Sequence, residues 1–243
     1  ALITTTGFRD VLEVRNQLRP RLYSVTTPRV LPVIPRNRVF EIDGRIDAFG
    51  AVVTDMTDAA LAELVDAVAA GNPESIAVCL TFAHLNPDHE TRLAEALRAR
   101  LPGTPIYLSH EINPQIEEWS RANTTAIAAY VGPIVDRYLT QLEATLETDR
   151  LTAPLRIMRS DGGVATPAST RINPAHTLLS GPAGGVVAAS ALIADLDISD
   201  AVTFDMGGTS ADFSVIVDGE ARMVGDRVIS SQPLRLPTLD VET

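Results

Sequence analysis

The sequence predicts an α/β fold in which mixed sheets are flanked by helices. Segments with the apolar patterns of strands alternate along the chain with segments of helical periodicity. Several strand-like segments lead through turn residues into a helix start, which is the order of strand–helix–strand units. The chain has 243 residues, enough for one large or two small packed domains.

The composition argues against nucleic acid binding, a membrane helix and a signal peptide. The formal net charge is −11 and the 20 basic residues are scattered, which argues against nucleic acid binding. No apolar run approaches the roughly 18 residues of a membrane helix, and residues 1–9 lack the basic start of a signal peptide. The single cysteine, Cys79, stands in an apolar run, so we expect a buried inert thiol and a cytoplasmic protein.

The first elements are short. Residues 1–5 predict a strand, residues 8–17 a short helix, and residues 38–42 an edge strand or hairpin arm because apolar and polar residues alternate there. Residue 1 is not methionine, and a strand is the first element. We therefore expect the chain to begin inside a longer protein.

A parallel crossover is predicted next. Residues 57–70 form a helix with Thr57 as its N-cap, and residues 75–82 form a buried strand. Asn86-Pro87-Asp88 then opens a helix to about residue 101, because Asn86 suits the cap, proline the first turn and aspartate the positive end of the helix dipole. A strand over residues 105–109 completes the unit.

The second half predicts these elements in order: a helical region over 114–147 broken near Gly132-Pro133, a strand over 155–160, a helix over 182–194, and an antiparallel meander over 202–205, 213–217 and 221–224. The turns of the meander fall at 207–208 and 218–219. We place a domain border between residues 118 and 119, which gives two domains, 1–118 and 119–243.

The most specific motif is Thr203-Phe-Asp-Met-Gly-Gly-Thr-Ser-Ala-Asp212. A strand delivers Asp205, and a carboxylate at that point suits a magnesium ion or an attacking water. Gly207 and Gly208 have no side chains, so phosphate oxygens can approach their backbone N–H groups, and Thr209 adds a hydroxyl. The alternative is an ordinary hairpin whose glycines supply positive φ. The apolar strand that Asp212 opens makes this alternative weaker.

A second motif lies just upstream, over residues 178–190, Leu-Leu-Ser-Gly-Pro-Ala-Gly-Gly-Val-Val-Ala-Ala-Ser. Gly184 and Gly185 oppose helix formation by about 1 kcal/mol each. We expect a ligand or a tight helix contact to compensate.

Other polar residues are weaker candidates. His84 and His89 lie five residues apart across a helix start, so they do not share a helical face and a metal site is unfavoured. Ser109 and His110 could act in acyl transfer, but adjacent residues in an extended segment point to opposite sides. Two further possibilities stay open: the turn 161–163 lines a cleft or only reverses the chain, and Arg159 and Arg171 bind an anion or lie on the surface.

The two glycine motifs together resemble the superfamily of actin, sugar kinases and chaperone ATPases, whose lobes have a ribonuclease H-like fold. In that superfamily a helix of small residues connects two lobes and immediately precedes the second phosphate loop. Here about ten residues separate the helix from Asp205. The resemblance implies a partial actin-like ATPase fold.

A narrower resemblance covers nearly the whole chain. Seven blocks, in the expected order, are similar to the large ATP-dependent subunit of the hydantoinase/5-oxoprolinase family (N-methylhydantoinase A-like). They lie at residues 1–13, 85–90, 109–114, 124–131, 157–163, 179–186 and 204–212.

This resemblance implies an ATP-dependent hydrolase that opens hydantoin, N-methylhydantoin or 5-oxoproline rings with a second enzyme subunit. ATP and Mg²⁺ would be the cofactors. Asp205 would be the catalytic and metal-binding carboxylate. The residues implied to bind the nucleotide are Gly207, Gly208, Thr209, Asp212, Gly184 and Gly185. Two alternatives stay open, a subunit of an acetone or acetophenone carboxylase and a non-catalytic assembly module.

The sequence also departs from the family pattern. A first Asp-x-Gly-Gly-Thr loop and an adenosine-binding loop are not found in these 243 residues. One loop holds a phosphate less well than two, so we expect weak or no ATP binding and no turnover by this chain alone. We also expect an exposed apolar face through which the chain self-associates.

Overall fold

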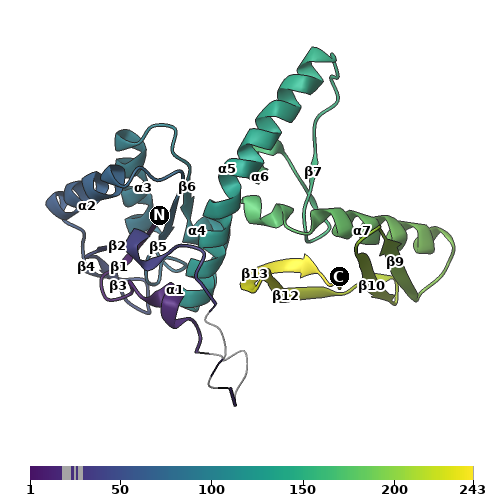
Figure 1. Cartoon of the computed structure of the whole chain (residues 1–243), viewed down its shortest axis with the longest axis horizontal. Coiled ribbons are helices and arrows are strands. Elements are labelled where there is room, and N and C mark those ends of the chain that lie inside the picture. The colour runs from purple at the N-terminus through teal and green to yellow at the C-terminus, as the bar shows by residue number, and fades with distance from the viewer. Residues whose placement is uncertain (18–22, 25, 27–29, 243) are drawn as a thin grey trace. The chain divides into compact units, whose positions relative to one another are not determined.

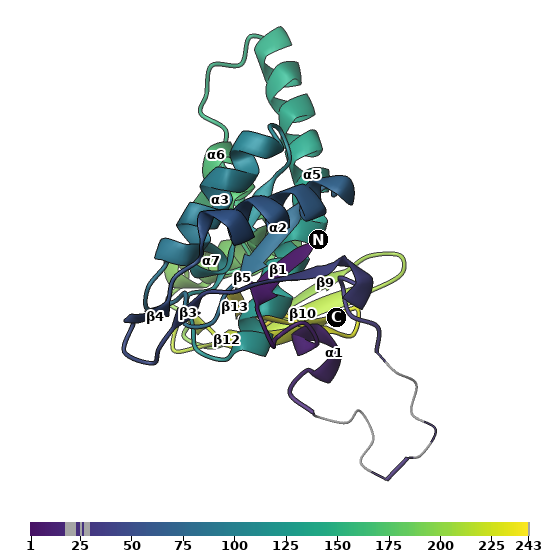
Figure 2. The same cartoon turned by 90° about the vertical axis from the view of Figure 1, so that its left-hand side faces the viewer.

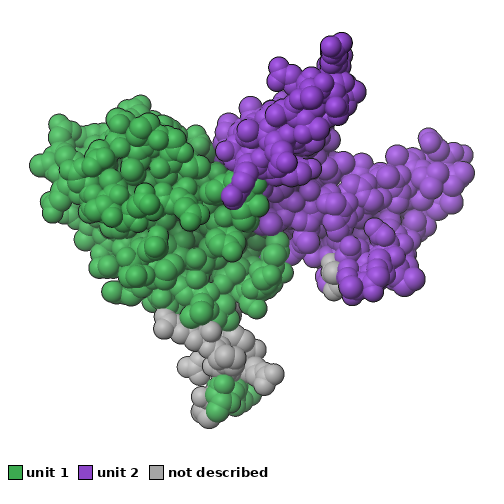
Figure 3. Space-filling model, turned by 45° about the horizontal axis from the view of Figure 1, so that its top comes forward, with its two compact units in different colours: residues 1–134, 228–234 green, residues 135–227, 235–243 purple. Residues whose placement is uncertain are grey.

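The computed structural model describes residues 1–17, 23–24, 26 and 30–242 (Figure 1). It divides into two compact units, coloured separately in Figure 3. Unit 1 comprises Ala1–Ile134 and Val228–Leu234, and unit 2 comprises Val135–Arg227 and Arg235–Thr243. The expected domain border coincides with the start of the helix α5 (Glu118–Thr148). It stays a prediction, because the units are defined by contacts and divide this same helix.

Unit 1 is built on a four-stranded parallel sheet. Its order is β2 (Val39–Ile42), β1 (Leu2–Thr5), β5 (Ile76–Cys79) and β6 (Ile106–Leu108). The predicted crossover is confirmed, because α3 (Asp88–Arg100) joins the parallel strands β5 and β6. β2 is an edge strand as predicted, but it runs parallel to β1 and is not a hairpin arm. The hairpin is the next one along the chain, β3 (Arg45–Ile46) with β4 (Val52–Thr54).

Helices cover one face of this sheet, as Figure 2 shows for α2 (Asp58–Ala70) and α3. Apolar residues of the strands, including Ile3 and Val78, form a buried core with those of the two helices. Thr57 caps α2 as predicted, since its hydroxyl accepts a hydrogen bond from the Ala60 N–H at 3.2 Å. Asn86 accepts from the Asp88 N–H at 3.0 Å, although Pro87 is the residue that directly precedes α3.

The predicted break at Gly132-Pro133 is wrong, because α5 continues through Pro133. A proline inside a helix leaves the carbonyl four residues earlier without its donor. That carbonyl belongs to Ala129, and the Ser75 hydroxyl donates to it at 2.6 Å. A β-carbon on Gly132 would lie only 1.8 Å from the Tyr107 hydroxyl oxygen. Neighbouring side chains of unit 1 thus supply the missing hydrogen bond and occupy the space beside the glycine.

Short elements complete unit 1. These are α1 (Val11–Val14), inside the predicted 8–17 helix, the 3₁₀ helix η1 (Arg36–Arg38), and α4 (Ser109–Ile112), which directly follows β6.

Unit 2 contains the predicted meander as a three-stranded antiparallel sheet, ordered β11 (Glu220–Ala221), β10 (Ala211–Val217), β9 (Ala201–Met206). The predicted strand over 221–224 is divided between β11 and β12 (Met223–Ile229), and β12 pairs with β13 (Gln232–Leu239). Parallel and antiparallel pairing therefore occur in different sheets, not mixed within the four-stranded or the three-stranded sheet.

The remaining elements of unit 2 precede the meander. They are the hairpin β7 (Ile157–Met158) with β8 (Val164–Ala165), α6 (Pro167–Ile172), the 3₁₀ helix η2 (Pro174–Thr177) and α7 (Ser180–Asp195). The predicted strand over 155–160 is reduced to two residues, and α7 begins two residues earlier than predicted. The small core of unit 2 joins α7 to the end of the chain through Ala183, Val186, Leu239 and Val241.

The sheet of β9 and β10 has two unlike faces. Ser214 and Ile216 on one face are buried. The other face, here called the exposed apolar face, carries Val202, Phe204, Met206, Phe213, Val215 and Val217, all between 44% and 72% exposed. In the described part of the chain, none of the helices is both long and apolar enough to cross a membrane.

Candidate nucleotide site

Two aspartates face each other on the sheet of unit 2. Asp205 near the end of β9 is the register partner of Asp212 at the start of β10. Directly opposed residues of an antiparallel pair have β-carbons about 4.5–5.5 Å apart, and like charges in these positions repel each other. A divalent cation bound between the two carboxylates would offset that repulsion.

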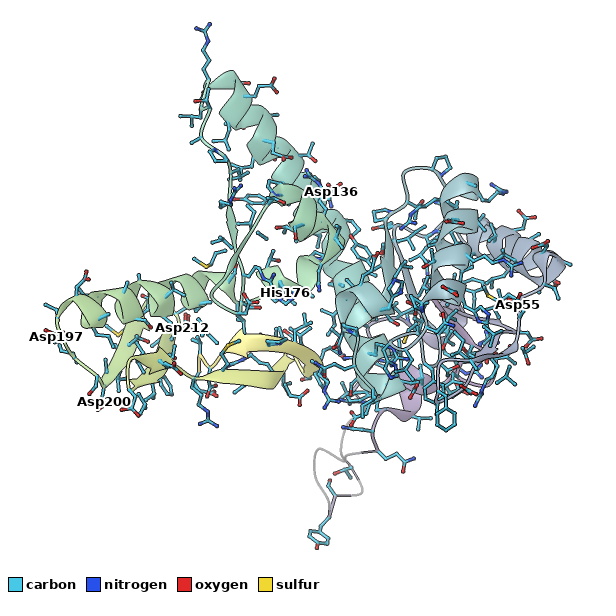
Figure 4. All side chains as sticks on the ribbon, turned by 180° about the vertical axis from the view of Figure 1, so that it is seen from behind. Asp55, Asp136, His176, Asp197, Asp200 and Asp212 are labelled. Atoms are coloured by element: carbon cyan, nitrogen blue, oxygen red, sulfur yellow. The ribbon has the colours of Figure 1, made fainter. Side chains whose placement is uncertain are left out.

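These aspartates line a pocket of about 320 Å³ between α7 and the strands. Figure 4 labels Asp212 on β10, beneath α7. The lining residues are Pro182, Gly185, Val186, Ala189, Thr203, Phe204, Asp205, Asp212 and Val241. The volume is at the lower end of the range for small-molecule sites, which is about 300–1,000 Å³.

The loop after β9 has free space around its two glycines. Neither Gly207 nor Gly208 has a positive φ. A β-carbon on Gly208 would meet no atom within 4 Å, and one on Gly207 would meet only the Ser210 carbonyl oxygen, at 3.7 Å. Neither backbone conformation nor packing requires these glycines, so the ordinary-hairpin explanation loses its support. Their backbone N–H groups can be approached closely.

The two glycines of α7 differ. Gly185 lines the pocket, and a β-carbon there would meet no atom within 4 Å. Gly184 is turned toward Met158, whose side chain would lie 3.7 Å from such a β-carbon, an ordinary contact. The structure therefore brings Gly185, Asp205 and Asp212 together and leaves Gly184 outside the pocket. Gly207, Gly208 and Thr209 continue beyond its lining.

Thr203 is a pocket residue that the sequence analysis missed. It lies two residues before Asp205, so both side chains are on the same face of β9. Its hydroxyl accepts from the Ser214 N–H at 3.1 Å, which ties β9 to β10 beneath the aspartates. Alternation along the strand was the signal that could have identified it.

The carboxylate pair suits magnesium better than zinc. Among the described residues, no group of three or more His, Cys, Asp or Glu side chains is arranged to hold a metal ion. Magnesium is commonly held by one or two carboxylates together with phosphate oxygens and water. Asp205 and Asp212 fit that mode, and their metal-binding role remains a prediction.

Several weaker candidates have structural roles. The turn at 161–163 is tight, with Gly162 at φ 82° and the Asp161 carboxylate accepting from the Gly163 N–H at 2.9 Å. Arg171 is paired with Asp136 and Glu143 at 2.6 and 2.7 Å, and Figure 4 labels Asp136 on α5. These ion pairs occupy Arg171 within unit 2.

Comparison with known proteins identifies the class. The hydantoinase/oxoprolinase family model matches residues 121–243, and the model of the N-terminal region of the same family matches residues 1–101. The chain belongs to the hydantoinase/oxoprolinase family.

Individual relatives are similar over the whole chain. A protein of Methanocaldococcus jannaschii is 31% identical over 99% of the chain, and the caprolactamase subunit alpha of Pseudomonas jessenii is 30% identical over 100%. The 5-oxoprolinase of Saccharomyces cerevisiae is 28% identical over 100%. The chain spans 37%, 35% and 21% of the lengths of these relatives, respectively.

Two solved structures have the same fold. The ATP-dependent caprolactamase of Pseudomonas jessenii matches 100% of the chain with a TM-score of 0.88 and 29% identity, over 36% of that protein's chain. A nucleotide-free acetone carboxylase matches 100% of the chain with a TM-score of 0.86, over 36% of its own chain. Its identity is 23%, so this second similarity concerns the fold alone.

Proposed function

We propose that unit 2 carries the second phosphate loop of an ATP site with an actin-like ATPase fold. The protein would be part of an enzyme subunit that uses ATP to open cyclic amides. The observation that carries the proposal is the opposed pair Asp205 and Asp212, which lines a pocket beside the open Gly185.

Each residue has a proposed role. Asp205 would hold Mg²⁺, with Asp212 as its partner across the strands. The backbone N–H groups of Gly207 and Gly208 and the hydroxyl of Thr209 would donate hydrogen bonds to phosphate oxygens. The metal, when bound, neutralises charge on the phosphates. Gly185 adds no side chain to the helix side of the pocket.

The chemistry explains why a ring-opening enzyme needs ATP. An amide carbonyl is a poor electrophile, but phosphorylation of its oxygen makes that oxygen a good leaving group. The bond between the γ-phosphorus and ADP breaks as a bond to the amide oxygen forms. Water then adds to the carbon, and the ring C–N bond opens as the nitrogen takes up a proton, which leaves an acyl phosphate. A second water hydrolyses the acyl phosphate to a carboxylate and inorganic phosphate. Hydantoins, 5-oxoproline and related lactams are the proposed substrates, because similar proteins are named 5-oxoprolinase and caprolactamase.

A second subunit is also proposed. The Pseudomonas relative is named subunit alpha, which implies a partner in that enzyme. The present chain, at about a third of that relative's length, is proposed to act within such a hetero-oligomer.

Amide NMR during titration with Mg-ATP tests the nucleotide site. A single phosphate loop offers few donors, so we expect a dissociation constant on the order of 1 mM. The signals of Gly207, Gly208 and Thr209 should shift. The Asp205→Ala variant should remove the magnesium-dependent part of binding.

Asp195→Ala is the matched control, because Asp195 is an exposed carboxylate at the end of α7, outside the pocket lining. It should bind Mg-ATP as the unaltered chain does. Equal binding by the Asp205→Ala variant would contradict the proposed site, as would shifts confined to residues outside the 207–209 loop and the pocket.

A further inference from the structure

Two histidines of unit 1 are joined by a chain of hydrogen bonds through buried side chains. These hydrogen bonds lie at the carboxyl ends of the parallel strands β5 and β6. Ligands of open α/β sheets bind beyond this edge of the sheet. His84 follows β5, and His110 lies in α4 directly after β6. Arg121, Ser109 and Glu90 connect them, and all three are 0% exposed.

Glu90 makes the hydrogen bonds of this network that lie nearest to His110. Its Oε1 accepts from the Leu80 N–H at 2.9 Å and from the Ser109 hydroxyl at 2.6 Å. Its Oε2 accepts from the backbone N–H of His110 at 3.2 Å and from the ring Nδ1 at 2.7 Å. Ser109 and His110 thus contact the same carboxylate. The expectation that they point to opposite sides is wrong, because α4 begins at Ser109 and the segment is not extended.

Arg121 makes the hydrogen bonds of this network that lie nearest to His84. Its Nε donates to the Ser109 hydroxyl at 3.1 Å, and its Nη2 donates to the Leu80 carbonyl at 2.9 Å. Its Nη1 lies 3.3 Å from Nδ1 of His84. The turn that carries His84 is strained at Phe82, a residue other than glycine with a φ of 57°. Strain of this kind persists where the surrounding structure imposes it, often at functional sites.

These contacts fix the tautomers of both rings. A guanidinium is only a donor, so Nδ1 of His84 accepts and its neutral ring carries the proton on Nε2. A carboxylate is only an acceptor, so Nδ1 of His110 donates, which leaves a lone pair on Nε2 of the neutral ring. Nε2 of His110 has no hydrogen bond to another described residue, and the side chain is 18% exposed. The two rings offer one donor and one acceptor.

We propose that His84 and His110 bind the ring amide of a cyclic amide at this edge of unit 1. For the class of substrate, the inference rests on the proposed function. In a lactam or hydantoin the carbonyl oxygen and the N–H lie on the same side of the ring. His84 donates from Nε2 to that oxygen, and His110 accepts the N–H at Nε2. Arg121 and Glu90 are positioning residues that fix the two rings.

His110 also accepts the amide proton. When the ring N–H gives its proton to Nε2, the electron pair stays on the amide and increases the charge on its oxygen. Burial lowers the pKa of His110, but the hydrogen bond and charge of Glu90 and the charge of Glu111 together raise it above 6.5, which makes a stronger base. Burial and the charge of Arg121 lower the pKa of His84 despite the charge of Glu118, which favours the neutral ring.

NMR of the histidine rings tests this site directly, because the chain has only four histidines. The probe is 2-pyrrolidone, with N-methyl-2-pyrrolidone as the matched ligand that lacks the N–H. We expect 2-pyrrolidone to shift the signals of His84 and His110 and to leave those of His89 and His176 unchanged. Binding should be at least tenfold weaker for the N-methyl compound, and weaker at pH 5.5 than at pH 8.5, since protonated His110 cannot accept.

Two variants separate ligand binding from folding. His110→Asn keeps a donor for Glu90, and His84→Asn keeps an acceptor for Arg121, but each removes the ring Nε2. Each should raise the dissociation constant of 2-pyrrolidone at least tenfold while the amide spectrum stays that of a folded chain.

The inference fails if 2-pyrrolidone leaves both ring signals unchanged in the folded chain, or if the N-methyl compound binds equally well. The Mg-ATP titration distinguishes this failure from that of the proposed function. Asp205-dependent nucleotide binding without lactam binding overturns the histidine site alone. Lactam binding together with nucleotide binding that does not depend on Asp205 overturns the phosphate-loop assignment alone.

Discussion

Glu90 shows how one buried carboxylate can organise the end of a sheet. Its charge is removed from water, which costs several kcal/mol unless donors and an opposite charge compensate. Its hydrogen bonds come from Leu80, Ser109 and His110, and Arg121 reaches it through Ser109. The ends of β5 and β6 and the first turns of α3 and α5 therefore depend on a single network.

The two histidines should affect stability with opposite dependence on pH. The folded-state pKa of His110 is raised, so its contribution is fully present below pH 6.5, the ordinary value, and is lost as pH rises through the folded pKa. The pKa of His84 is lowered, so folding excludes a proton and its neutral form contributes more stability as pH rises toward 6.5.

Urea unfolding at pH 5.5, 7 and 8.5 measures this difference. The destabilisation caused by His110→Asn should shrink between pH 5.5 and 8.5, and that caused by His84→Asn should grow. Parallel profiles for the unaltered chain and both variants would show that the two rings do not titrate differently in the folded and unfolded states.

At the scale of residues, the sequence predicts what depends on near neighbours. Thr57 and Asn86 were identified as helix-start residues because a short polar side chain two or three positions before a backbone N–H can cap it. The network around Glu90 could not be predicted in this way. Arg121 and Leu80 lie 41 residues apart in the sequence, and no periodic pattern links them.

Among the elements, the helices α5 and α7 both contain glycine, but packing requires the glycine in only one of them. Gly132 in α5 is required, because a β-carbon would overlap the Tyr107 hydroxyl group. Gly185 in α7 faces open space and weakens its helix by about 1 kcal/mol relative to alanine. Packing explains the first glycine and does not explain the second.

Alanine substitutions should separate these cases. Gly185→Ala should raise the free energy of unfolding by up to about 1 kcal/mol through helix propensity, yet weaken Mg-ATP binding because its methyl group enters the pocket. Gly132→Ala should lower the free energy of unfolding by about 1–3 kcal/mol, as overpacking does. Urea unfolding and the NMR titration measure both effects.

Unchanged nucleotide binding by the Gly185→Ala variant would remove Gly185 from the site. A stabilising Gly132→Ala substitution would mean that Tyr107 moves aside at little cost.

The order of elements was largely predictable, and their neighbours in space were not. The helices at 57–70 and 88–100 and the final meander follow from periodicity and turn residues. The predicted break at Pro133 failed because Ser75, from a distant strand start, supplies the missing donor. The pairing of β2 beside β1 likewise depends on chain path, which local pattern does not specify.

At the scale of the whole molecule, the sequence predicts an exposed apolar face, and the sheet of β9 and β10 has one. Register pairs place Val202 opposite Val215 and Phe204 opposite Phe213. A contiguous apolar surface of this kind favours association. We expect two copies of this chain to associate through it.

Sedimentation equilibrium measures that association. Replacing the Val202–Val215 pair by threonines keeps the strand preference but removes apolar surface, and should raise the dimer dissociation constant about tenfold or more. Val53→Thr is the control, because Val53 is also an exposed strand valine, at 63% against 68% for Val202, and lies on β4 of unit 1. An equal effect of both changes would place the contact elsewhere.

The hydrogen bond from Ser75 to Ala129 has a consequence for how the sequence can evolve. If Pro133 is replaced first, the helix regains its own donor and the serine becomes dispensable. If Ser75 is replaced first, the buried carbonyl of Ala129 loses the donor that compensates for Pro133, at a cost of about 1–3 kcal/mol. Both positions can therefore change without loss of stability only if Pro133 is replaced before Ser75. As long as a lineage keeps the proline, selection for stability keeps the serine as well.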